Sequence, residues 1–157
     1  MKLGMGDLRR WRAAVAFALL VTVGLSARGW AKELTLEELK ERVAGASVGD
    51  RPALCIEIAE RQEEAASKLY GAGDVDKAAA ALGDVATFSE MARDYAIQSH
   101  KHEKQSEIAI RKMARKLGSL KHNLVQEDQK QIQDTIDRLE KIRDDLLAAM
   151  FPNGVKK

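Results

Sequence analysis

Cysteine and aromatic residues are scarce in this chain of 157 residues. The single cysteine, Cys55, has no partner for an internal disulfide, and we expect it to be a small buried apolar side chain. Aromatic residues make up 4% of the sequence, and runs of β-branched residues, which favour strands, are scarce. Alanine and long charged side chains dominate instead, so the composition predicts helices almost throughout.

Sequence motifs that carry chemistry are missing as well. There is no Glu-x-x-His pair for a di-iron site, no His-Glu-x-x-His for zinc hydrolysis and no Cys-x-x-Cys-His for haem attachment. A glycine-rich phosphate loop is also lacking, so no enzyme is indicated and we predict no cofactor. The weak metal-ligand candidates are His100, Glu103 and Glu107, which share one face of a helix. A solvated band of polar residues is the favoured interpretation of that cluster.

The first 31 residues have the order of a bacterial signal peptide. The basic start consists of Lys2, Arg9, Arg10 and Arg12. An apolar stretch follows at 13–23, which is shorter than the roughly 20 residues that span a bilayer. Small residues at positions 29 and 31 predict cleavage after Ala31, so the processed chain would be periplasmic or secreted and would not span a membrane. Cleavage after Ala27 and an uncleaved anchor are the alternatives.

Removal of residues 1–31 changes the charge of the chain. The segment holds five of the 26 basic residues and one of the 24 acidic residues, so the remainder has 21 basic and 23 acidic groups and a formal charge of −2. The basic pI of the precursor therefore reflects targeting rather than affinity for nucleic acid. We expect one helical domain over 32–151 and a short polar tail at 152–157.

Capping and breaking residues predict where the first helices begin and end. Thr35, with Glu38 three residues later, has the pattern of a capping box. Pro52 is typical of the first turn of a second helix, which we expect Gly71 to close. Asp74 then caps a third helix.

The extent of the third helix decides the details of this all-α fold. Residues 98–106 include no apolar residue, but most of them are compatible with a helix. Counted back from Leu117 in alternating steps of four and three, the apolar phase continues across this gap. We therefore expect one long central helix over about 75–118, with the second and the C-terminal helix folded back on it as antiparallel hairpins. The alternative is a compact four-helix bundle with a joint near His100.

The segment from Ala66 to Leu82 resembles the helical hairpin of a tetratricopeptide repeat. The resemblance is carried by Ala66, Leu69, Gly73, Asp74, Lys77, Ala78 and Leu82. In that family a small residue lets the paired helices touch, and the Gly-Asp turn joins them. No second copy follows 34 residues later, because His100 and Glu103 stand where alanine and leucine would recur. The resemblance implies a helix-turn-helix geometry and favours partner binding.

Charge is unevenly distributed along the C-terminal half. Residues 101–121 include seven basic and two acidic groups, and residues 127–145 include seven acidic and four basic groups. One explanation is that opposite charges fix the pairing of two helices. The other is a basic patch that binds an acidic protein or an anionic envelope component. This patch consists of Arg111, Lys112, Arg115 and Lys116.

These features favour a non-enzymatic interaction or structural protein of the bacterial cell envelope, because such a protein needs only exposed helical surfaces. We expect a protein or an anionic envelope component as its partner, and pairing of two copies along the long helix would give a homodimer. Nucleic acid is not an expected partner, since residues 101–121 include no aromatic side chain to stack on bases. The alternative function is a small-ligand or metal-carrying helical bundle.

Overall fold

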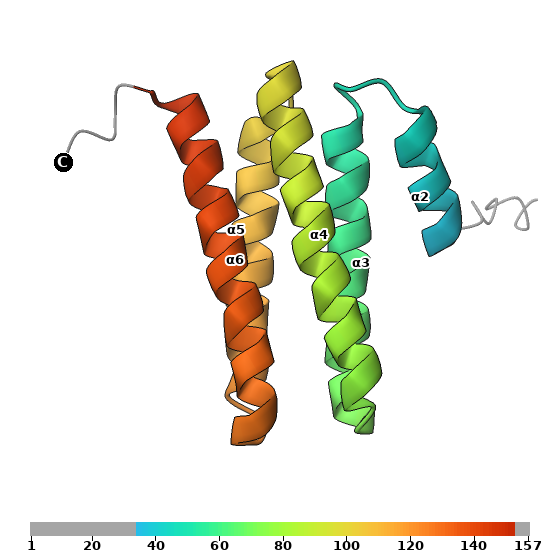
Figure 1. Cartoon of the computed structure of the whole chain (residues 1–157), viewed down its shortest axis with the longest axis vertical. Coiled ribbons are helices and arrows are strands. Elements are labelled where there is room, and N and C mark those ends of the chain that lie inside the picture. The colour runs from blue at the N-terminus through green and yellow to red at the C-terminus, as the bar shows by residue number, and fades with distance from the viewer. Residues whose placement is uncertain (1–33, 153–157) are drawn as a thin grey trace, which may run out of the picture. The chain divides into compact units, whose positions relative to one another are not determined.

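The structure, a computed structural model, describes residues 34–152. The helices of this range are α2 (Leu36–Gly45), α3 (Arg51–Ala72), α4 (Val75–Ser99), α5 (Glu103–Lys121) and α6 (Gln126–Met150). The described residues include no strand, which confirms the predicted all-α fold (Figure 1). The predicted signal peptide, its cleavage after Ala31 and the predicted tail beyond Pro152 lie outside the described residues.

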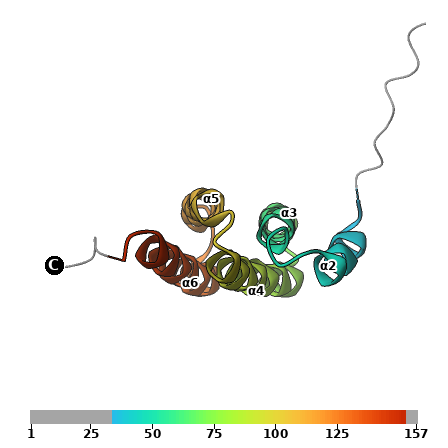
Figure 2. The same cartoon turned by 90° about the horizontal axis from the view of Figure 1, so that it is seen from above.

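Helices α3 to α6 form two antiparallel hairpins that stand side by side, α3 with α4 and α5 with α6 (Figure 1). Viewed from above, α3 and α5 lie in one layer, whereas α2, α4 and α6 lie in the other (Figure 2). Contacts also join α4 to α6 and α3 to α5, so each helix of one hairpin lies against its counterpart in the other. Helix α2 packs on α3.

The capping box at the start of α2 forms as predicted. The hydroxyl of Thr35 accepts a hydrogen bond from the backbone N–H of Glu38 at 3.2 Å. The Glu38 carboxylate accepts one from the backbone N–H of Thr35 at 2.7 Å, and this bond lowers the pKa of Glu38. Two orphan donors of the first turn are thus satisfied by residues three positions apart.

The turn between α3 and α4 lies two residues later than expected. Gly71 does not close α3, because the helix continues to Ala72 and its cap is Gly73. Gly73 has φ of 80°, a left-handed conformation that glycine adopts without a steric penalty. Asp74 precedes α4 as predicted, but its side chain makes no capping hydrogen bond and instead accepts one from Lys77 at 3.2 Å. The expected helix-turn-helix geometry is nevertheless present.

The core between the hairpins joins small side chains of α4 to larger ones of α6. The buried residues of α4 are Ala78, Ala81, Leu82, Val85, Ala86, Ser89, Ala92 and Ala96. Those of α6 are Ile132, Thr135, Ile136, Leu139, Ile142 and Leu146. A second cluster joins α2, α3 and α4 and consists of Leu39, Val43, Cys55, Ile58 and Ala92. Cys55 is fully buried, as predicted, and burial raises the pKa of its thiol to about 11.

The predicted continuous helix over 75–118 is wrong. Helix α4 ends at Ser99, and the chain reverses before α5 begins at Glu103. His100 and His102 both have left-handed backbone conformations, with φ of 53° and 62°. The reversal places the apolar stripe of α5 in the same core as the apolar stripe of α4. This arrangement buries more apolar surface than a single long helix would, because each half of such a helix would contact only one neighbouring helix. Tertiary burial thus overrides local helix propensity, and the alternative with a joint near His100 is the one observed.

Candidate interaction groove

The weak metal candidates are not brought together. The Nδ1 atom of His100 lies 3.5 Å from Oε1 of Glu103, but the carboxylate of Glu107 instead accepts a hydrogen bond from Arg143 of α6 at 3.0 Å. Within residues 34–152, no three side chains of His, Cys, Asp or Glu are placed to hold a metal ion. Glu107 is therefore a structural partner of arginine.

The predicted basic patch is divided by the way that α5 packs. Lys116 points to α3, where its ammonium group lies 2.8 Å from the carboxylate of Glu63. Arg111 lies 3.6 Å from Glu107 on its own helix. Lys112 and Arg115 are exposed, and neither side chain forms an ion pair in the described part of the chain. Only part of the patch is thus free to meet a partner.

The ion pairs of α5 and α6 do not follow the pattern in which a basic helix pairs with an acidic one. Among the described residues, the one ion pair that joins them is Glu107 to Arg143, with the acid on α5 and the base on α6. Two other charged residues of α6 pair with α4 instead. These pairs are Arg138 with Glu90 at 2.8 Å and Asp145 with Arg93 at 2.9 Å. The positive charge of α5 is therefore largely left for other contacts.

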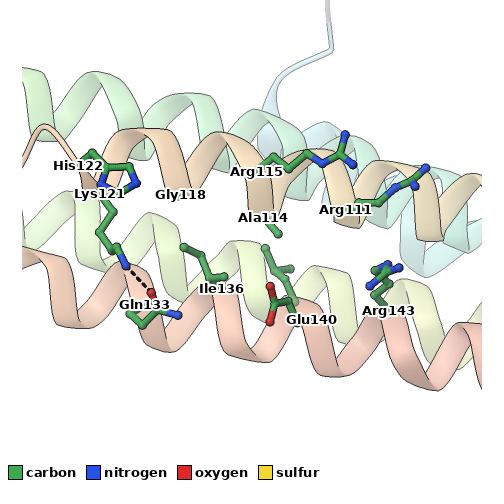
Figure 3. A pocket seen from close by; sticks show the side chains of 11 residues that line it. Arg111, Ala114, Arg115, Gly118, Lys121, His122, Gln133, Ile136, Glu140 and Arg143 are labelled. Atoms are coloured by element: carbon green, nitrogen blue, oxygen red, sulfur yellow. Dashed lines mark hydrogen bonds between the residues drawn. The ribbon is translucent and has the colours of Figure 1, made fainter.

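A groove of about 500 Å³ lies between α5 and α6 (Figure 3). Its apolar lining consists of Ala114 and Gly118 from α5 and Ile136 and Leu139 from α6. A Cβ atom at Gly118 would have no neighbour within 4 Å, so the groove has room at this point of its wall. Small residues on α5 thus leave the groove open above Ile136 and Leu139, which are themselves buried.

Basic side chains line both walls of the groove (Figure 3). They are Arg111, Arg115, Lys121 and Arg143, joined by His122, whereas the one acidic residue of the lining is Glu140. Arg111 and Arg143 both contact the buried carboxylate of Glu107, and Arg143 also lies 3.9 Å from Asp144, whereas Arg115 and Lys121 form no ion pair among the described residues. Lys121 donates a hydrogen bond to the neutral side chain of Gln133 at 2.6 Å. The groove therefore keeps an excess of positive charge beside an apolar floor.

Two of the three arginines that line this groove could be predicted from the sequence. Arg111 and Arg115 belong to the predicted patch, and the structure adds Arg143 from the opposite wall. The charge pattern of the sequence did not indicate Arg143, because this residue lies in a segment whose net charge is negative. The apolar stripe of α6 could be predicted from the sequence, and it forms one wall of the groove. The open space at Gly118 could not be predicted, because it depends on how α5 is rotated about its axis.

Comparison of the chain with protein-family models, with curated proteins and with solved structures found no match. Among helices α2 to α6, none combines the length and the apolar character needed to cross a bilayer.

Proposed function

We propose that the mature chain is an exported, non-enzymatic helical protein of the bacterial cell envelope whose α5–α6 groove binds an acidic segment of a partner protein. The observation that carries the proposal is the excess of basic side chains around an apolar floor. Arg115 supports it most directly, because this residue is exposed and forms no ion pair within residues 34–152.

An amphipathic acidic helix fits the groove better than a simple polyanion does. Its apolar side chains would pack against the half-buried Ala114 and Gly118, and its carboxylates would meet Arg115 and the arginines that contact Glu107. Arginine suits this contact because its planar guanidinium binds carboxylates through paired hydrogen bonds. A ligand that offers charge without apolar surface would leave the space beside Gly118 unfilled.

Binding can be tested with a labelled model peptide. The probe is an amphipathic helix with leucine at helical spacing on one face and glutamate beside it, and the control peptide has glutamine in place of glutamate. We expect the acidic peptide to bind the protein of residues 32–157 with an affinity that falls as salt rises, and the glutamine peptide to bind weakly. Stronger binding to anionic lipid vesicles than to the peptide would contradict the proposed class of partner.

Two pairs of variants locate the binding surface. Arg115→Glu reverses a charge in the groove, and we expect peptide affinity to fall by roughly 5- to 30-fold, which corresponds to about 1–2 kcal/mol. Its control, Lys112→Glu, makes the same change on the same helix at an exposed residue that does not line the groove. Gly118→Leu fills the groove, and Gly83→Leu is its control on α4, where an added Cβ also has no neighbour within 4 Å. Equal effects within either pair would refute the assignment.

Export is supported by the order of basic, apolar and small residues over 1–31. The expected mature N-terminus is Lys32. Mass spectrometry of the protein recovered from a periplasmic or secreted fraction tests this directly, because an intact N-terminus would refute cleavage.

A further inference from the structure

The joint between α4 and α5 is built from residues that suit a helix better than a turn. It consists of His100, Lys101 and His102, and both histidines have positive φ. Side chains with a Cβ atom are strained in this conformation, which glycine or asparagine accepts more readily. His102 also makes no side-chain capping hydrogen bond at the start of α5. The Ser99 hydroxyl accepts a hydrogen bond from the backbone N–H of Lys101 at 3.3 Å, but no glycine or asparagine relieves the strain, so the packing of the helices must help to hold the reversal.

The residues around the joint can form a continuous helix without losing the apolar phase. The stretch Gln98–Ser106 includes no glycine, proline, asparagine or aspartate. Steps of four and three lead from Leu82 and Ala96 in α4 to Ile110 in α5, and all three side chains are fully buried. A straight helix through the joint would therefore keep the apolar stripes of α4 and α5 on one face, with Ser99, Glu103 and Ser106 between them.

We infer that two copies of this chain exchange their α5–α6 hairpins, with the joint extended into a helix that runs from α4 into α5. Each hairpin then packs on α3 and α4 of the other copy and remakes the same interface there. The ion pairs that would form between copies are Lys116 with Glu63, Arg138 with Glu90 and Arg93 with Asp145. The exchange keeps these contacts and removes the left-handed residues, and short strained joints favour such a swap.

The joint can be tuned in both directions. Glycine at both histidine positions, His100→Gly with His102→Gly, relieves the strain of the turn and weakens a continuous helix, so we expect the dimer dissociation constant to rise by roughly tenfold or more. His100→Ala with His102→Ala keeps the strain and strengthens the helix, so the same constant should fall. Light scattering after size-exclusion chromatography, over a wide range of concentrations of residues 32–157, measures both effects.

Cross-linking distinguishes a swapped dimer from two copies that only lie side by side. In a Cys55→Ala background, chains with Glu90→Cys are mixed with longer, tagged chains that have Arg138→Cys, unfolded and refolded together, and treated with a short bis-maleimide. These positions are partly exposed and face each other across the two hairpins. The control pair is Gln62→Cys with Asp84→Cys. The Nε2 atom of Gln62 lies 2.5 Å from Oδ2 of Asp84 within the α3–α4 hairpin, which is not exchanged.

The expected result is a link between chains for the first pair and none for the control, together with opposite shifts of the dissociation constant in the two joint variants. A monomer at every concentration would overturn the inference. So would a dimer that links both pairs equally or neither pair, or one whose dissociation constant does not respond to the joint variants. The inference depends on the joint alone, so failure of peptide binding at the groove does not affect it.

Discussion

Replacement of Lys116 by methionine tests how the two hairpins are joined. Lys116 binds Glu63 at 2.8 Å, and among the described residues this is the one ion pair that links α3 to α5. Glu63 is 4% exposed, so its carboxylate has little access to water. Methionine keeps most of the apolar stem of lysine but leaves the buried carboxylate without its charged partner.

The expected loss of stability on Lys116→Met follows from how far the side chains of Lys116 and Glu63 are buried. A hydrogen bond to a charged group is worth about 1.5–3 kcal/mol, but 43% of the Lys116 side chain is exposed, so water replaces part of it. We therefore expect Lys116→Met to lower the free energy of unfolding by about 1–2 kcal/mol, or Tm by about 4–8 °C in a domain of this size. Lys112→Met, at an exposed and unpaired lysine of the same helix, should change stability by less than about 0.5 kcal/mol.

A double-mutant cycle isolates the pair. Urea unfolding, followed by far-ultraviolet circular dichroism, is measured for Lys116→Met, for Glu63→Gln and for both changes together. We expect the double variant to be more stable than Lys116→Met, because glutamine leaves no buried charge unpaired. If Lys116→Met and Lys112→Met proved equally stable, the pair would contribute nothing and the reasoning would be refuted.

The same pair predicts a dependence on pH. The hydrogen bond to Glu63 raises the pKa of Lys116 above its ordinary value. The folded pKa therefore exceeds that of the unfolded chain, which is about 10.4. Stability from the pair is complete below that value and is lost as pH rises through the folded pKa. The coupling energy from the cycle should thus persist at neutral pH and vanish in strongly alkaline solution.

Two further predictions concern single residues. Thr35→Ala removes the hydroxyl that caps α2 and should lower the free energy of unfolding, measured in urea, by about 1 kcal/mol. Hydrogen bonds to Thr35 lower the pKa of Glu38, so the stabilisation that they give is complete above the pKa of Glu38 in the unfolded chain and is lost as pH falls through its folded pKa. A loss of stability confined to pH values below the folded pKa of Glu38 would therefore contradict the prediction. Cys55, with its pKa raised to about 11, should resist Ellman's reagent in the folded protein at neutral pH and react only on unfolding. Because the unfolded thiol ionises first, stability should fall from about pH 8.5 to 11 in the native chain more steeply than in Cys55→Ala.

Features that depend on neighbours in sequence could be predicted, because the interacting groups are only a few residues apart. The Thr35 capping box is one case, since its two hydrogen bonds join residues at a spacing of three. The joint at His100 is the opposite case. Most residues over 98–106 are compatible with a helix, and the reversal is decided by apolar contacts between α4, α5 and α6, which local sequence does not encode.

The candidate site divides in the same way. That Arg111 and Arg115 lie on one surface follows from their spacing of four residues. The roles of the other basic residues depend on partners that are distant in sequence. Lys116 donates a hydrogen bond to Glu63, which lies 53 positions earlier in the sequence. Arg143 of α6 lines the groove and donates a hydrogen bond to Glu107, which lies 36 positions earlier. These contacts depend on how α5 is rotated about its axis between α3 and α6. That rotation cannot be derived from counts of charged residues along the chain.

The alanines of α4 have a consequence for how this protein can change over time. Ala78, Ala92 and Ala96 are fully buried where α4 meets its neighbours, so a longer side chain at any of them would force the helices apart. The leucines and isoleucines of α6 can be exchanged for one another at far smaller cost. Substitutions should therefore accumulate on α6 and spare the methyl-sized positions of α4. Distant relatives would be recognised by the spacing of those small residues more readily than by their large apolar ones.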